Sequence, residues 1–355
     1  MIVRCLAILL MASFVGPPAL HAAQISPPIL GYVFDSGVYG LRPIWGILGS
    51  STVGAALDTE GVRLSLAAVS PGQDYALGIR EHDNQIMLLG LDQNPLAVTV
   101  LATSDSAIER VVFSPMGISV VLVPQNRQSL WLISGLPHSP KILDRIGLST
   151  LSGTLGSLGV RDDGQQIILA MQEGDSDALY TSDSKGTLHG LARLGKITAI
   201  EYMRQGTDAL VADAGTSEIL RIRDTDSKME ALATLTGEGK TVKPTALALS
   251  DDNQRLFIAV EGQAPLYVLN LQNGQVVHLP FSGKVIGLNR LKGDSLFRLN
   301  DLSDEPLWVL NGGLLEPAVA FVPAPKKNTV PNDGLFNSPR GEPRPISVRG
   351  RSATQ

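Results

Sequence analysis

The sequence predicts an all-β protein: a β-propeller with six to seven four-stranded blades in a single ring, with seven favoured. Three observations lead to this fold. A short strand-like segment recurs six times, similar turns accompany the copies, and no window of about 12 residues keeps a helical period free of turn signals. Equivalent residues of the copies are separated by 44, 49, 40, 47 and 41 residues, the spacing of one propeller blade; they are Met87, Trp131, Tyr180, Leu220, Tyr267 and Trp308.

Each copy belongs to a repeated unit of four strands. An apolar strand runs into a tight turn, and a second strand, a polar loop, the recurrent strand and a weaker final strand follow. Pro at the second position and Gly or Asn at the fourth are typical of a type I turn with a left-handed exit. The turns are expected at 70–73, 114–117, 161–164, 203–206, 250–253 and 290–293, and second strands at 75–79, 120–123, 167–170 and 256–260.

Two further strands are expected before the first full unit, at 29–34 and 41–47, and a late strand at 319–322. If these three pair, the N- and C-terminal strands share one blade and lock the ring. The result is either six blades with an extra hairpin or seven with an incomplete one, and we favour seven. A two-sheet sandwich is the alternative fold, but six four-stranded units would over-fill it, whereas a ring leaves few edges exposed.

The turn-and-hairpin units resemble the WD40-like and YVTN-type propeller repeats that are common in exported bacterial proteins. Residues 113–117, Phe-Ser-Pro-Met-Gly, match best, followed by 68–72, Ala-Val-Ser-Pro-Gly, and the resemblance covers about residues 60–315. It implies the propeller fold. It does not imply an activity, because such repeats occur in scaffolds, binding modules and enzymes.

The two ends of the chain differ from the body. Residues 1–23 are expected to be a secretory signal peptide, with Arg4, an apolar run over 5–15 and small residues at Ala22 and Ala23. Cleavage there removes Cys5, the single cysteine, and leaves no stable membrane anchor, so the mature protein is expected in the periplasm or outside the cell. The propeller domain is expected over 24–322. Residues 323–355 read as a disordered, Pro-rich basic tail of charge +4, which leaves −9 for the rest of the chain.

The loops between the second and third strands of successive blades are rich in acids. Propeller geometry brings these loops to one face, and they contain eleven acids against a single base, Arg127. We expect this acidic loop face, or the channel mouth, to bind a protein or peptide, with a basic segment or the protein's own tail as candidates; solubility is the alternative explanation. The candidate residues are Glu81, Asp83, Glu173, Asp175, Asp177, Asp213, Glu218, Glu261, Asp301, Asp304 and Glu305.

Motifs for catalysis are weak. The four histidines outside the signal peptide are widely separated, and the acid-rich stretches at 173–177 and 224–226 do not continue into a calcium loop. No cofactor is predicted, although a divalent cation remains an option. The alternative function is a metal-assisted hydrolase or lactonase-like enzyme, which would need inward-facing carboxylates or amides from at least three blades. The polar residues expected on inner strands are Glu109, Arg161, Glu201 and Asn289.

Nucleic-acid binding is disfavoured by export and by the acidic body. We expect a monomeric, non-catalytic binding or scaffolding module.

Overall fold

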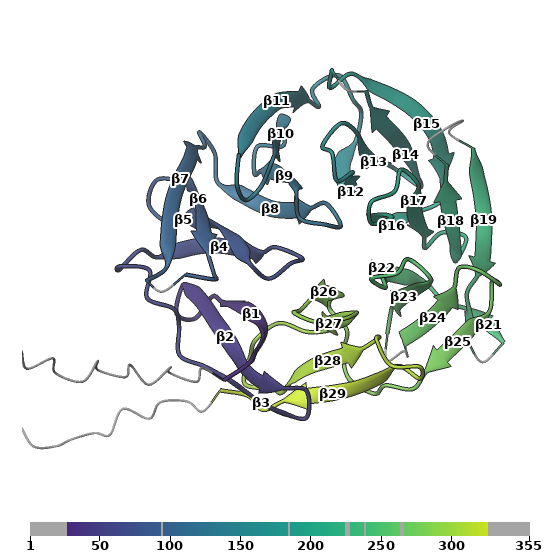
Figure 1. Cartoon of the computed structure of the whole chain (residues 1–355). Helices are drawn as coiled ribbons and strands as arrows, with labels where there is room; N and C mark the ends of the chain where they lie inside the picture. The colour runs from purple at the N-terminus through teal and green to yellow at the C-terminus, as the bar shows by residue number, and fades with distance from the viewer. Residues whose placement is uncertain are drawn as a thin grey trace, which may run out of the picture.

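A computed structural model describes residues 27–325 apart from 94, 184, 224–227, 238 and 263–265. The expected signal peptide over 1–23 and all of the expected tail beyond residue 325 lie outside the described residues. The described chain forms seven antiparallel sheets in a ring, so the predicted propeller is confirmed with seven blades (Figure 1). None of the described residues is helical, and thus no helix in this part of the chain could cross a membrane.

The first strand of each blade lies nearest the channel and the last lies at the rim (Figure 1). Blade 1 contains β1 (Ile29–Asp35), β2 (Gly40–Ile47) and β3 (Ser50–Val53). Blade 2 contains β4 (Leu64–Val69), β5 (Tyr75–Arg80), β6 (Gln85–Gly90) and β7 (Ala97–Thr103). Blade 3 contains β8 (Ile108–Phe113), β9 (Ser119–Pro124), β10 (Ser129–Ser134) and β11 (Lys141–Gly147). Blade 4 contains β12 (Thr154–Val160), β13 (Ile167–Glu173), β14 (Ser176–Ser182) and β15 (Leu188–Leu194).

Blades 5 to 7 have four strands each, as blades 2 to 4 do. Blade 5 contains β16 (Ile197–Tyr202), β17 (Ala209–Asp213), β18 (Glu218–Ile222) and β19 (Met229–Thr234). A short hairpin of β20 (Thr236–Gly237) and β21 (Lys240–Thr241) leads to blade 6, with β22 (Pro244–Leu249), β23 (Arg255–Val260), β24 (Leu266–Asn270) and β25 (Val276–Leu279). Blade 7 contains β26 (Asn289–Arg290), β27 (Leu296–Arg298), β28 (Leu307–Asn311) and β29 (Ala318–Val322). The six recurrent segments are the third strands of blades 2 to 7.

Both faces of a blade are buried against its neighbours, which explains the continuous apolar strands. In β9, Val120 and Leu122 pack toward blade 2, whereas Val121 and Val123 pack toward blade 4. Side chains alternate across a strand, so one apolar run supplies two interfaces. Among the described residues these contacts form seven buried clusters, one between each pair of neighbouring blades around the ring.

The N- and C-terminal strands do not pair with each other, and the ring has seven blades, of which the first is incomplete. β29 pairs with β28, from Leu307 opposite Val322 to Asn311 opposite Ala318, and thereby completes blade 7 with residues of that blade alone. The N-terminal hairpin of β1 and β2 is confirmed, but with β3 it forms a separate, three-stranded blade. The ring closes instead through a backbone bond, from the N–H of Lys292 to the carbonyl of Leu30 at 2.9 Å, and through core packing. Leu30, Val33 and Ile44 of blade 1 pack against Leu291 and Val309 of blade 7.

Candidate functional site

The turns between first and second strands meet at one end of the channel. Five of the expected four-residue turns are closed by a backbone bond from the fourth residue to the first carbonyl, at 2.9–3.1 Å. The left-handed residue is the fourth of the turn, as expected, at Gln73, Gly117, Gly164 and Asn253. In the turn at 203–206 it is the third residue, Gln205, and in blade 7 it is Ser295, two residues beyond the expected turn. The predicted turns are therefore confirmed in blades 2 to 6, whereas in blade 7 Arg290 belongs to strand β26 and the chain turns after it.

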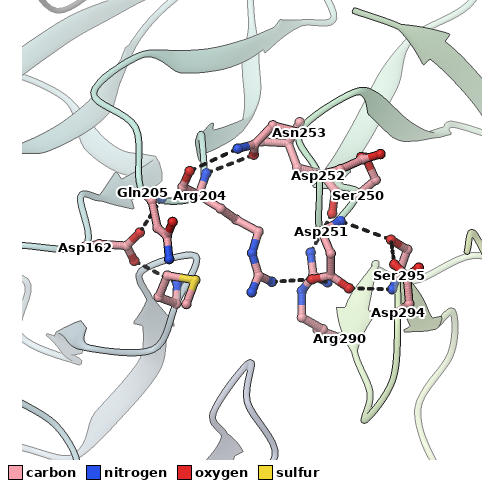
Figure 2. Close-up of polar contacts among 12 residues, drawn as sticks. Asp162, Arg204, Gln205, Ser250, Asp251, Asp252, Asn253, Arg290, Asp294 and Ser295 are labelled. Carbon is pink, nitrogen blue, oxygen red and sulfur yellow. Dashed lines mark hydrogen bonds and ion pairs between the residues drawn. The ribbon is translucent and has the colours of Figure 1, made fainter.

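Hydrogen bonds join the turns of successive blades from blade 3 to blade 6. Asp162 of blade 4 accepts the backbone N–H of Met116 in blade 3 at 2.7 Å and that of Gln205 in blade 5 at 2.9 Å (Figure 2). The amide of Asn253 in blade 6 pairs with the backbone N–H and carbonyl of Arg204 in blade 5, both at 3.0 Å. These contacts tie blades 3 to 6 together at the channel mouth.

Asp251 is the centre of a charged cluster in the same place. Its carboxylate accepts Arg204 Nη1 at 2.6 Å and Arg290 Nη1 at 2.7 Å, and it also accepts the backbone N–H of Ser295 at 2.7 Å (Figure 2). Arg290 donates in addition to the carbonyl of Leu249. The negative charge of one carboxylate in blade 6 therefore stabilises the positive charges of two guanidinium groups, one from blade 5 and one from blade 7.

Glu201, on β16, faces this cluster from the channel wall. Burial, together with the Asp162 carboxylate, raises the pKa of Glu201 to about 7, although Arg290 and Arg204 act in the opposite direction. Burial lowers the pKa of Arg290, and the nearby carboxylates, Asp251 first among them, oppose that shift. At the channel mouth, the pKa values of Glu201 and Arg290 thus depend on burial and on the charged groups around them.

A cavity of about 320 Å³ opens between blades 1, 2, 3 and 7 at this end of the channel. Half-buried apolar side chains, Phe34, Val69 and Phe113 among them, form much of its wall, and Asn289, Arg290 and Arg298 add polar groups. Arg298 reaches the cavity from the second strand of its blade because the inner strand β26 has only two residues.

The Gln73 side chain connects blades 1, 2 and 7 beside this cavity. Its Oε1 accepts the backbone N–H of Tyr32 at 2.8 Å, and its Nε2 donates to the carbonyl of Arg290 at 2.8 Å. The amide thus links the N-terminal blade to the C-terminal one through blade 2.

Most of the eleven acids predicted as a site have partners in the structure. Glu81 pairs with Arg63 at 2.8 Å, Asp301 with Arg298 at 2.6 Å and Glu261 with Lys243 at 3.8 Å. Asp83 pairs with Arg80, and Glu173 with Arg193. These five bases belong to neighbouring strands or their ends, so an inventory restricted to the loops omitted them.

Two of the acids are buried and bind backbone. Asp177 accepts the N–H of Ile197 at 2.7 Å, which joins blade 4 to blade 5. Asp213 accepts four N–H groups, including those of Gly195 at 2.9 Å and Lys196 at 2.8 Å. Burial favours a higher pKa for Asp213, but these donors outweigh it and lower the pKa. Of the remaining acids, Glu218 is half-buried, and Asp175, Asp304 and Glu305 are exposed. Asp304 also has an interaction within the chain.

The structure also shows the contacts of the other polar residues expected on inner strands. Glu109 pairs with Arg127 at 2.8 Å and Arg161 with Asp163 at 2.9 Å, whereas Asn289 lines the cavity. Within the described ranges, no group of three or more His, Cys, Asp or Glu residues is arranged to hold a metal ion. Sequence reasoning missed the cluster of Arg204, Asp251 and Arg290, although the signal was present, since all three lie in predicted turns.

Comparison with known proteins supports the fold. No family model matches the chain, and no curated protein matches it by sequence. A functionally unknown protein from Desulfotomaculum acetoxidans DSM 771 is similar in structure, with a TM-score of 0.56 and 12% identity over 84% of this chain and 100% of that one.

Two further solved structures are similar as well. Hsv2 of Kluyvelomyces marxianus has a TM-score of 0.52 and 11% identity over 83% of this chain and 97% of that one. The WD40 repeats of RRP9 have a TM-score of 0.50 and 10% identity, over 76% and 83%. At these identities the similarity shows a fold shared with WD40-type propellers.

Proposed function

We propose that this protein is a non-catalytic binding or scaffolding module that works outside the cytoplasm, as an exported propeller of the WD40-like or YVTN type. The signal-like residues 1–23 support export, and the WD40-type fold supports a binding role. The observation that carries the proposal is the channel-mouth cavity, where guanidinium groups lie in an apolar wall. Cavities of this kind, apolar with a few convergent polar groups, are where proteins bind ligands.

The chemistry of the cavity favours an apolar group that carries a carboxylate. Arg298 makes its two hydrogen bonds within the described chain through Nη1, to the carbonyl of Asn300 at 2.9 Å and to Asp301 at 2.6 Å. Its Nε and Nη2 remain as donors for a carboxylate, and Phe34 and Phe113 offer apolar contact. The proposed ligand is a peptide segment in which an apolar side chain adjoins a free carboxylate.

The loop side is a second proposed surface, for a basic partner segment. Asp175, Asp304 and Glu305 are exposed there, and their potential would attract positive charge at low salt. The alternative of a metal-assisted enzyme has less support, because Asp162 and Asp251 at the channel mouth already accept backbone N–H and guanidinium donors.

A peptide library tests the proposal. Fluorescent pentapeptides that end in an apolar residue are offered to the full-length protein with a free C-terminal carboxylate or as amides, and binding is followed by polarisation. We expect the free acids to bind more tightly. Arg298→Gln should weaken binding about 10- to 100-fold, the equivalent of roughly 1.5–3 kcal/mol for a charged hydrogen bond.

Arg193→Gln is the matched control, because Arg193 pairs with Glu173 on the loop side. This variant should bind as the parent does. Equal binding of acids and amides, or equal losses in the two variants, would contradict the proposed site.

A further inference from the structure

Blade 1 lacks the outer strand that every other blade has. β3 is the last strand of its sheet, and residues 54–63, all described, run to β4 without forming another strand. β3 lies beside β29, the outer strand of blade 7 (Figure 1). The rim of the ring is therefore one strand short at the junction of the first and last blades.

The outer edge of β3 has backbone N–H and C=O groups that could pair with another strand. Gly54 N–H bonds inward to the carbonyl of Pro43 at 2.8 Å, and alternate residues of an antiparallel strand bond to the same side. The backbone groups of Ser51 and Val53 consequently face away from β2. An edge of this kind is a template for a further strand.

A groove accompanies this edge. A space of about 500 Å³ lies between β3 and β29, and its lining includes Ser51, Thr52, Phe321 and Pro323. Phe321 is 54% exposed although it contacts the ring of Trp308, and Ile47 at the β2 end is 62% exposed. The Ser51 hydroxyl is buried and has no hydrogen-bond partner in the described part of the chain. Apolar surface and an unpaired polar atom thus lie at the same free edge.

We propose that residues 346–349 of the same chain add to β3 as the fourth strand of blade 1. The described chain leaves at Pro325, just beyond Pro323 on the groove wall, and the 20 intervening residues can span far more than the groove at about 3.3 Å per residue. Within 326–355, apolar β-branched residues alternate with polar ones at Ile346, Ser347, Val348 and Arg349. That alternation is typical of a half-buried strand, and Pro345 is acceptable at its start.

The exposure pattern of β3 sets the register. Ser51 is buried and Val53 half-buried, whereas Ser50 and Thr52 are exposed. An antiparallel strand with Val348 opposite Ser51 and Ile346 opposite Val53 places both apolar side chains on the buried face. Ser347 then lies opposite Thr52 on the exposed face. Pairing in this register would join the C-terminal segment to the N-terminal blade.

Disulfide trapping tests this contact in the full-length chain. Cys5→Ser removes the single cysteine, and Thr52→Cys is combined either with Ser347→Cys or, as a matched control in the same segment, with Asn337→Cys. Under mild oxidation we expect an intramolecular disulfide to form at least 10-fold faster with Ser347→Cys. Equal rates, or disulfides found between chains in place of within one, would overturn the proposal.

Hydrogen exchange supplies an independent measurement. Ile346→Asp with Val348→Asp should expose the outward amides of Ser51 and Val53, so that they exchange at least 10-fold faster than in the parent. Leu335→Asp with Phe336→Asp places the same charges elsewhere in the segment and should leave both amides unchanged. Unchanged exchange in the first variant, or equal acceleration in both, would also overturn the proposal.

Discussion

At the scale of single residues, the channel mouth is organised by shared charge. Arg204 and Arg290 both bond to Asp251, so one carboxylate compensates two guanidinium groups that are mostly shielded from solvent. Charges in such a position are costly unless they are paired and hydrogen-bonded. Glu201 is close enough to interact with Arg290 and Arg204 of the same cluster, and burial raises its pKa.

The raised pKa of Glu201 should make the stability of the protein depend on pH. The pKa of this side chain is raised from 4.5 to about 7, so the native state holds this proton in a range where the unfolded chain has released it. The ionised form is therefore penalised in the native state, and stability is lost as the pH rises from 4.5 through about 7. We expect Glu201→Gln to raise the urea midpoint at pH 8 and to change it little near pH 4.5. Glu305→Gln, in an exposed loop, is the control, and an equal effect of Glu201→Gln at both pH values would refute the assignment.

At the scale of elements, the blades hold together through their interfaces, and the junction of blades 7 and 1 is the one made by the two ends of the chain. Gly31 is tightly packed there: a Cβ on it would lie 2.7 Å from Leu291 Cδ2 and 2.9 Å from Gln73 Oε1. The neighbouring N–H of Tyr32 donates to the same Gln73 oxygen. Close backbone approach, hydrogen bonding and core packing coincide at this residue.

Gly31→Ala should therefore destabilise the ring by about 1–3 kcal/mol, the usual cost of overpacking. Urea unfolding measures the change. Gly147→Ala is a matched control, since a Cβ at Gly147 meets nothing within 4 Å, and it should shift stability by less than about 0.5 kcal/mol. Similar losses in both variants would show that the junction does not limit stability.

At the scale of the whole molecule, a ring of seven interfaces forms a body that needs no disulfide. The buried clusters run continuously from blade to blade, and the single cysteine of the sequence lies in the expected signal peptide. A domain of this size buries enough apolar surface to fold without covalent links. Export is thus compatible with the fold, and it remains a proposal that rests on residues 1–23.

Intact mass of exported protein tests that proposal. We expect a mature N-terminus near Ala23 or Gln24 and no reaction with a thiol reagent, because cleavage removes Cys5. A mass that retains residues 1–22, or a reactive thiol, would contradict export by signal cleavage.

The sequence by itself determined the features that depend on neighbouring residues. The repeat of the third strands, the turns at 70–73 and 250–253, and the propeller ring all follow from apolar alternation and turn chemistry, and the structure confirms them. The repeat favoured seven blades over six without deciding between them, and the structure has seven. The way in which the first and last blades close the ring could not be predicted from local sequence patterns. Whether β29 pairs with β28 or with the N-terminal hairpin depends on competition between strands that are all apolar, and local pattern does not distinguish them.

Only the tertiary structure decided which charges meet. Asp251 and Arg290 are 39 residues apart, yet ring geometry brings their turns together, whereas Glu81 and Asp301 received partners from strands outside the loops that were counted. An ion pair depends on side-chain atoms within about 4 Å, and residue types along a chain do not specify that distance. Repetition along the sequence therefore determined the propeller, while the folded ring determined which of its charged residues meet in ion pairs and hydrogen bonds.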